Sequence, residues 1–318
     1  MTKPITKKMA KPQVLTQSIR NGLVEEEHFG YLVHVDSGKV TFMTGETADE
    51  PFYLRSCAKP LQASVIVDYD LDFDEKEIAL ACGSNAGESC HEEIARRLAD
   101  KIGVKETDLK CGIHKPLSIT RQNEMILNGE QPNVFQNNCI GKHLTMLALC
   151  KKLGFETEDY DNINHPVQQI IKNKVNSFCR VNKEYPVTKD GCGVPILSMP
   201  LKNIVWGFLD MFCDEKYSSA RHAILENPYI FGGEYRTDTK IIKETGMLSK
   251  VGAGGLCVVV NCAQKEGFIV KISDCDMKTR EIVAFDYIKK LGWGDFETDK
   301  SIKTLHGETV GEIKTFIS

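Results

Sequence analysis

The chain has 318 residues, of which 42% are hydrophobic and 26% are charged, and its formal net charge is −4. This composition is typical of a soluble globular protein, and the slight acidity argues against a surface dedicated to nucleic acid or to an anionic membrane. The N-terminus carries lysines without an apolar stretch of signal-peptide length, and no segment has about eighteen consecutive apolar residues. We therefore expect a cytoplasmic protein, with no nucleic-acid or membrane partner, that binds small molecules or a second copy of itself.

The N-terminal part is predicted to form a pair of strands. Segments 31–36 and 40–43 flank Asp36-Ser37-Gly38-Lys39, whose Ser-Gly pair is typical of a hairpin. From residue 57 to about 180, apolar residues recur at helical spacing, in 61–68, 92–102, 141–153 and 166–177. This pattern predicts a helical layer or subdomain at about 57–180.

The remaining elements are a loop at 191–195, a helix at 218–227, strands at 255–260 and 267–272, and a helix around 277–291 followed by a polar tail. The glycine-dense segments 232–239 and 250–255 are interpreted as turns near a site. Strands at both ends of a helical middle predict an α+β fold within one unit spanning residues 1–318.

Ser56-Cys57-Ala58-Lys59, followed by Pro60, places a serine three residues before a lysine. If a helix begins here, both side chains lie on one face, and Pro60 fits its first turn because proline lacks a backbone N–H. A buried lysine has a lowered pKa, so its neutral amine can take the proton of Ser56 as the hydroxyl attacks a carbonyl. The alternative is that Ser56 only caps the helix.

Twelve cysteines are scattered through the chain, and reduced thiols are favoured over a disulfide framework. Cys139 precedes Lys142 by three residues where another helix is expected to begin, which favours a thiolate that can act as nucleophile, redox group or metal ligand. The alternative is a buried cysteine at a capped helix.

Asp190-Gly191-Cys192-Gly193-Val194-Pro195 predicts a fixed turn. In it, Cys192 can complete a metal site with Cys139, and Asp190 can orient a neighbouring base or bind a substrate ammonium; a plain turn is the alternative. Two thiolates and a nitrogen suit zinc, provided that the lysine is neutral.

Ser84 lies in a second glycine-bounded loop, 83–88, and Lys271 is a single cation within an apolar strand pattern. Because an unpaired buried charge is costly, a partner is expected opposite Lys271. This partner is either a structural carboxylate or a serine such as Ser84.

Taken together, these segments resemble the asparaginase II family, the rhizobial type of L-asparaginase. Seven collinear motifs carry the resemblance: Val24-Glu25 with His28 and Gly30, Arg55 to Gln62, Cys111-Gly112 with His114 and Pro116, Asn138-Cys139 with Gly141-Lys142-His143, His165 to Gln168, Asp190 to Gly193 with Pro195, and Lys250 to Ala253.

The resemblance implies a fold like that of serine β-lactamases and glutaminases, usually as a homodimer. It implies Ser56 as nucleophile with Lys59 as its base, and Ser84 with Lys271 as a second Ser-Lys pair. The positions that match the family's zinc ligands are Cys139, Lys142 and Cys192, and those expected to bind the substrate's charged groups or tune the metal are Arg55, His143 and Asp190.

The chain departs from the family pattern at three places. Ser84-Asn85-Ala86-Gly87-Glu88 stands where Ser-His-Ser-Gly-Glu is common, Ile140 replaces a small serine, and Cys275 replaces a glycine after Asp274. The first change lies beside the predicted second pair and bears on substrate preference.

The leading hypothesis is an amidohydrolase that converts L-asparagine into aspartate and ammonia through an acyl-enzyme on Ser56, with zinc holding the substrate or shaping the pocket. One alternative is a Ser-x-x-Lys hydrolase of another amide or a β-lactam. Another is a non-catalytic zinc- or redox-sensing protein that works through Cys139 and Cys192.

Overall fold

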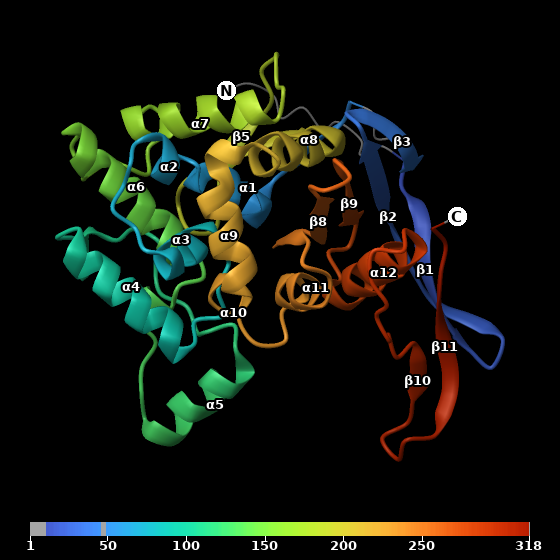
Figure 1. Cartoon of the computed structure of the whole chain (residues 1–318). Helices are drawn as coiled ribbons and strands as arrows, with labels where there is room; N and C mark the ends of the chain where they lie inside the picture. The colour runs from blue at the N-terminus through green and yellow to red at the C-terminus, as the bar shows by residue number, and fades with distance from the viewer. Residues whose placement is uncertain (1–10, 46–48, 318) are drawn as a thin grey trace, which may run out of the picture.

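The structure is a computed structural model that describes residues 11–45 and 49–317. An antiparallel sheet lies beside a region of helices, which confirms the α+β prediction (Figure 1). The strand order is β10-β11-β1-β2-β9-β8-β7, with β3 paired to β2. The strands are β1 (Gln13–Arg20), β2 (Leu23–Asp36), β3 (Lys39–Thr44), β7 (Leu248–Gly252), β8 (Leu256–Asn261), β9 (Glu266–Ile272), β10 (Ser301–Lys303) and β11 (Thr309–Thr315).

Helices follow one another from Arg55 to Thr245, so the helical region extends well beyond the predicted limit near residue 180. They are η1 (Arg55–Cys57), α1 (Ala58–Ala63), α2 (Val65–Asp68), α3 (Glu75–Cys82), α4 (Ser89–Lys101), η2 (Glu106–Asp108), α5 (Ile119–Asn128), η3 (Val134–Gln136), α6 (Ile140–Leu153), α7 (Pro166–Phe178), α8 (Leu201–Phe212), η4 (Glu215–Tyr217), α9 (Ser218–Glu226), α10 (Pro228–Phe231) and α11 (Thr237–Thr245). A small sheet of β4 (Pro51–Tyr53), β6 (Pro195–Pro200) and β5 (Val187–Lys189) lies among them.

The central strands are covered on both faces. α8 packs on one face of β8 and β9, and α12 (Met277–Lys290) packs on the other. Alternate residues of β8 enter two different cores, Val258 facing the α8 side and Val259 the α12 side. Because β8 is buried on both faces, its sequence is a continuous apolar run, and this run is the pattern that predicted the strand.

The polar tail after α12 contains two strands that the sequence pattern did not predict: β10 and β11 extend the sheet beyond β1. These strands are mostly polar and only partly buried, so they lack the apolar alternation that reveals a strand. The segments 232–239 and 250–255 are not only turns: the first runs into α11 and the second begins within β7.

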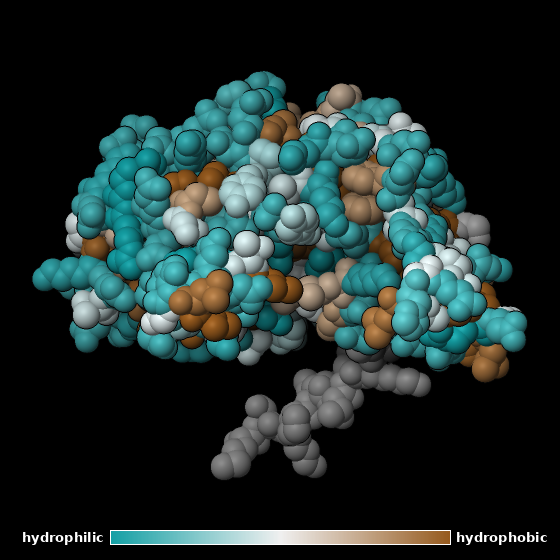
Figure 2. All heavy atoms as spheres, turned by 90° about the horizontal axis from the view of Figure 1, so that it is seen from below, coloured by the Kyte–Doolittle hydropathy of each residue, from teal (hydrophilic) through white to brown (hydrophobic). Residues whose placement is uncertain are grey.

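Figure 2 shows the molecule from below, with apolar side chains scattered over a mostly hydrophilic face. Three of the most exposed apolar residues belong to α5: Ile119, Ile126 and Leu127. In the described part of the chain, no helix is both long and apolar enough to cross a membrane.

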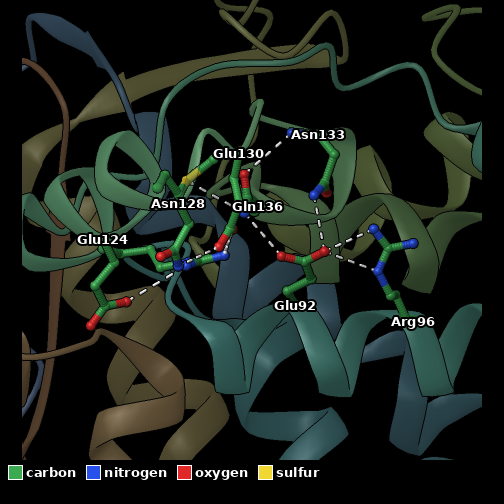
Figure 3. A network of polar contacts seen from close by, with 9 residues as sticks. Glu92, Arg96, Glu124, Asn128, Glu130, Asn133 and Gln136 are labelled. Atoms are coloured by element: carbon green, nitrogen blue, oxygen red, sulfur yellow. Dashed lines mark hydrogen bonds and ion pairs between the residues drawn. The ribbon is translucent and has the colours of Figure 1, made fainter.

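A network around Glu92 joins α4 to the segment that leads into α6 (Figure 3). The carboxylate of Glu92 accepts hydrogen bonds from Asn133 Nδ2 and Gln136 Nε2, each at 2.9 Å, and from Arg96 at 2.8 and 3.0 Å. Because Gln136 is almost fully buried, this carboxylate satisfies an amide that water does not reach. The network therefore fixes the chain immediately before Asn137.

Glu92→Ala is expected to lower the free energy of unfolding by about 1–3 kcal/mol, because it removes the carboxylate acceptor of the buried Gln136 amide and leaves only the weak contact with Met125 Sδ at 3.7 Å. Urea unfolding followed by circular dichroism measures this change. Glu93→Ala is the matched control, since Glu93 is the next residue of α4 and is exposed; its effect should stay within about 0.5 kcal/mol. Equal effects of the two substitutions would contradict the assigned role of Glu92.

Candidate active site

Ser56 lies in η1, immediately before α1, which confirms the predicted start of a helix. Arg55, the preceding residue, has a φ of +48°, in the left-handed region that is costly for a residue other than glycine. Leu54 and Cys57 occupy the N-cap positions of η1 and α1, and neither cap uses a side-chain hydrogen bond. Ser56 is therefore not a helix cap, and its hydroxyl is available for another role.

The hydroxyls of Ser56 and Ser84 are neighbours. Ser84 Oγ donates a hydrogen bond to Ser56 Oγ at 3.4 Å, and Asn138 Nδ2 donates one to Ser84 Oγ at 3.2 Å. Ser56 also lies one helical turn before Lys59, whereas Ser84 lies in the loop after α3. This position favours Ser56 over Ser84 as the hydroxyl that gives its proton to a base.

Lys59 is buried one turn after Ser56. Burial lowers the pKa of its ammonium to about 8; the Cys139 thiolate opposes this shift, and the charge of Lys142 adds to it. Its Nζ donates to the backbone oxygen of Asn138 at 2.6 Å. Within residues 11–45 and 49–317 it has no hydrogen bond to Ser56, so Asn138 is the residue that joins the lysine to the two serines.

Asn138 is itself held in place. Its backbone N–H and its Oδ1 both lie 3.2 Å from His114 Nε2. The preceding residue, Asn137, donates to the backbone oxygens of Cys111 and Gly112 at 2.9 and 3.0 Å. The sequence analysis named Asn138 and His114 as parts of motifs but assigned neither a role. Asn138 contacts Lys59 through its backbone carbonyl, which every residue type has, so the residue type does not reveal the contact.

Cys139, Asp190 and Cys192 bring two sulfurs and a carboxylate oxygen within 4.8 Å of one another. A hydrogen bond from Cys192 holds the pKa of Cys139 well below its usual value, and the same bond raises that of Cys192. Thiolate and carboxylate donors at this spacing suit zinc, so the predicted pairing of Cys139 with Cys192 fits a metal.

The Nζ of Lys142, the third predicted ligand, lies 3.7 Å from Asp190 Oδ2. Burial would lower the pKa of this lysine, but Cys139, Cys192 and Asp190 together raise it above its usual value. Lys142 therefore has to lose a firmly held proton before it can bind a metal, whereas Asp190 does not.

Two of the predicted substrate-binding residues are joined to each other: Arg55 Nε donates to Asp190 Oδ1 at 2.9 Å. The side chain of Arg55 is 38% exposed, so it can also reach a ligand from solvent. His143 is fully buried, with its Nδ1 2.6 Å from the hydroxyl of Tyr160, and burial holds its pKa well below the usual value. This position does not favour the predicted contact between His143 and substrate.

The structure does not join Lys271 to Ser84. Lys271 Nζ donates to the backbone oxygen of Ile272 at 2.6 Å, and no hydrogen bond or ion pair links it to Ser84 in the described part of the chain. The lysine on the strand nearest η1 is instead Lys250, on β7. It is fully buried, pairs with Asp238 at 3.3 Å, and its charge helps to lower the pKa of Lys59. The sequence analysis named Lys250 as part of a motif but assigned it no role in the site.

Comparisons with known proteins agree with the resemblance seen in the motifs. The family model described as L-asparaginase II matches residues 16–315. No curated protein sequence matches the chain.

Among solved structures, a class C β-lactamase from Rhodobacter sphaeroides is 12% identical with a TM-score of 0.41, over 82% of this chain and 94% of that one. A putative β-lactamase from Bacteroides dorei is 13% identical with a TM-score of 0.39, over 76% and 85%. Structural similarity at this level carries no information about activity. The family model, in contrast, matches nearly all of the sequence. The chain therefore belongs to the L-asparaginase II family.

Proposed function

We propose that the protein is an L-asparagine amidohydrolase in which Ser56 is the nucleophile and Lys59 its base. Membership of the L-asparaginase II family supports an amidohydrolase of the asparaginase type. The observation that carries the proposal is the hydrogen-bonded order Asn138, Ser84, Ser56 beside a buried lysine whose pKa is lowered to about 8.

In the first step, neutral Lys59 takes the proton of Ser56 while Oγ attacks the side-chain carboxamide carbon of asparagine. The hydrogen bond from Ser84 to Ser56 Oγ stabilises the negative charge that develops as the proton leaves. The C–N bond then breaks, the leaving nitrogen takes the proton held by Lys59, and ammonia departs. An aspartyl ester remains on Ser56.

In the second step, water attacks the ester carbonyl and Lys59 accepts one of its protons. Breaking the ester bond releases aspartate and returns a proton to Ser56, which restores the enzyme. Asn138 keeps the lysine and both hydroxyls in one arrangement throughout, because it bonds to Lys59 through its backbone and to Ser84 through its side chain.

The charged groups beside the serines suit a zwitterionic amino acid. Arg55 offers a guanidinium to the α-carboxylate of the substrate, and Asp190 holds that guanidinium in place. A zinc ion bound by Cys139, Cys192 and either Asp190 or a neutral Lys142 would supply fixed positive charge at the pocket wall. Ser56 supplies the nucleophile of the first step and water that of the second, and neither is activated by the zinc ion.

Ser56→Ala is expected to lower ammonia release from L-asparagine by at least about 10³-fold, because no ester can form. Ser84→Ala should cost less, about 10²-fold in kcat, since it removes one hydrogen bond to the developing alkoxide. Ammonia release measured in parallel from L-asparagine and L-glutamine checks both. A greater loss in Ser84→Ala than in Ser56→Ala would exchange the two roles, and covalent labelling of Ser56 by a penicillin with no amide turnover would favour the β-lactam alternative.

The value of kcat/KM is expected to rise with pH, to reach half of its limiting value near pH 8 and to level off above it. The neutral amine is the active form of Lys59, and its fraction grows about tenfold per pH unit below the pKa of about 8. Lys59→Arg keeps the positive charge but stays protonated, so turnover should fall by about 10²–10⁴-fold at every pH. A wild-type profile that stays flat from pH 6 to 9 would contradict the assignment of Lys59 as base.

Cys139→Ser/Cys192→Ser is expected to bind one equivalent of zinc fewer than the wild type while keeping measurable ammonia release. The first effect follows from the loss of both sulfur donors, and the second from a nucleophile that lies outside the metal site. Elemental analysis and the ammonia assay measure them. Loss of turnover as complete as in Ser56→Ala, in a folded variant, would place the metal in the chemistry itself.

A further inference from the structure

A second cluster of possible metal ligands lies at the N-terminus of α4. Glu88, Cys90 and His91 each offer one ligand atom, and the three atoms lie within 4.8 Å of one another. Glu88 and His91 are buried, and Cys90 is partly exposed, so an ion can reach the cluster from solvent. None of these residues belongs to the thiol site of Cys139 and Cys192.

The ring of His91 is fixed in the orientation that a metal ligand needs. Its Nε2 lies 3.1 Å from the backbone oxygen of Tyr229, which can only accept, so Nε2 carries the proton. Nδ1 then carries the lone pair, which accepts the backbone N–H of Glu88 at 3.1 Å. A histidine whose other nitrogen donates to a carbonyl is the usual arrangement at a metal site. Stacking on the Tyr229 ring, with centroids 5.8 Å apart, also fixes the imidazole plane.

The separation of the two softer donors also fits a metal. His91 Nδ1 lies 3.8 Å from Cys90 Sγ. Tetrahedral zinc with bonds of about 2.1 Å to nitrogen and 2.3 Å to sulfur places these atoms about 3.6 Å apart. Nδ1 presently accepts the backbone N–H of Glu88 at 3.1 Å, and a bound ion would replace that contact.

The carboxylate of Glu88 lies beside this nitrogen. The residue is only 8% exposed; one carboxylate oxygen accepts the backbone N–H of Glu234 at 3.2 Å, and the other, Oε2, has no partner at hydrogen-bond geometry among the described residues. The nearby hydroxyl of Tyr229 interacts with this carboxylate; burial raises the pKa of Tyr229, and this interaction adds to the shift. A buried carboxylate oxygen in this state is costly, and a bound cation would satisfy it.

We propose that Glu88, Cys90 and His91 form a second metal site, which takes Zn²⁺ or a divalent ion of similar softness. Carboxylate, thiolate and imidazole together are a ligand set that zinc accepts, and partial exposure of Cys90 leaves room for water in the fourth position. Binding releases the proton of the Cys90 thiol to solvent.

A metal bound here would position the loop 83–88. Glu88 ends this loop, and Ser84, its second residue, donates its backbone N–H to the oxygen of Phe231 at 3.0 Å. A metal that joins Glu88 to His91 would fix the end of the loop to α4 without touching the reacting atoms.

The test compares metal binding by the full-length wild type, Cys90→Ser and Cys275→Ser after loading with Zn²⁺ and dialysis. Cys90→Ser is expected to hold one equivalent of zinc fewer than the wild type. The site of Cys139 and Cys192 is the same in both proteins, so any zinc that it binds does not change this difference. Cys275→Ser, which removes an exposed cysteine far along the chain, should hold as much as the wild type.

Glu88→Gln is the second variant, since it keeps the thiol and nearly the same shape. With Co²⁺ as probe, it should bind at least about tenfold more weakly at this site, and Cys90→Ser should lose the corresponding thiolate-to-cobalt absorption. Equal zinc content in Cys90→Ser and the wild type would overturn the proposal. Because the readout is metal content, the outcome is independent of amide hydrolysis.

Discussion

The burial of the Lys59 amine is the constraint on which the rest of the site depends. An ammonium removed from water is costly, and here its described hydrogen bond is to the backbone oxygen of Asn138. The same burial lowers the pKa enough for the lysine to serve as a base near neutral pH. A lysine left in solvent at this position would stay protonated and could not activate Ser56.

The fold provides this burial by packing the sheet edge β7 against η1, while α3 and α6 enclose α1. Gly252 on β7 and Gly141 on α6 allow the close approach, since a Cβ at Gly252 would lie 3.1 Å from Cys57 Sγ and one at Gly141 would clash with the backbone oxygen of Leu80. Buried charge is then balanced locally: Asp238 pairs with Lys250, and Asp190 lies between Arg55 and Lys142. Besides burial, the positive charges of Lys142 and Lys250 both lower the pKa of Lys59, so the protonation of the base depends on the charged residues around it.

Local signals in the sequence predicted the parts of the structure that depend on neighbours in the chain. The spacing of Ser56 and Lys59, and the helix beginning at Cys139, needed only the helical period and residue types. The role of Asn138 could not be predicted, because it arises from a backbone carbonyl and from contacts with Ser84, 54 residues away. The pairing of Lys271 with Ser84 also depended on residues far apart in the chain, and the structure does not join them. The strand nearest η1 is β7, and its lysine is Lys250. Homodimer formation, the cytoplasmic location and zinc stay predictions.

The central claim is that an aspartyl ester forms on Ser56, and the most direct test is to find it. The protein would be mixed with L-asparagine, quenched in acid during the first turnovers, digested and mapped by mass spectrometry. The account predicts an aspartyl adduct on the peptide that contains Ser56, present during turnover and absent in Ser56→Ala. An adduct on Ser84 or on Cys139 instead, or ammonia release at the wild-type rate in Ser56→Ala, would contradict it.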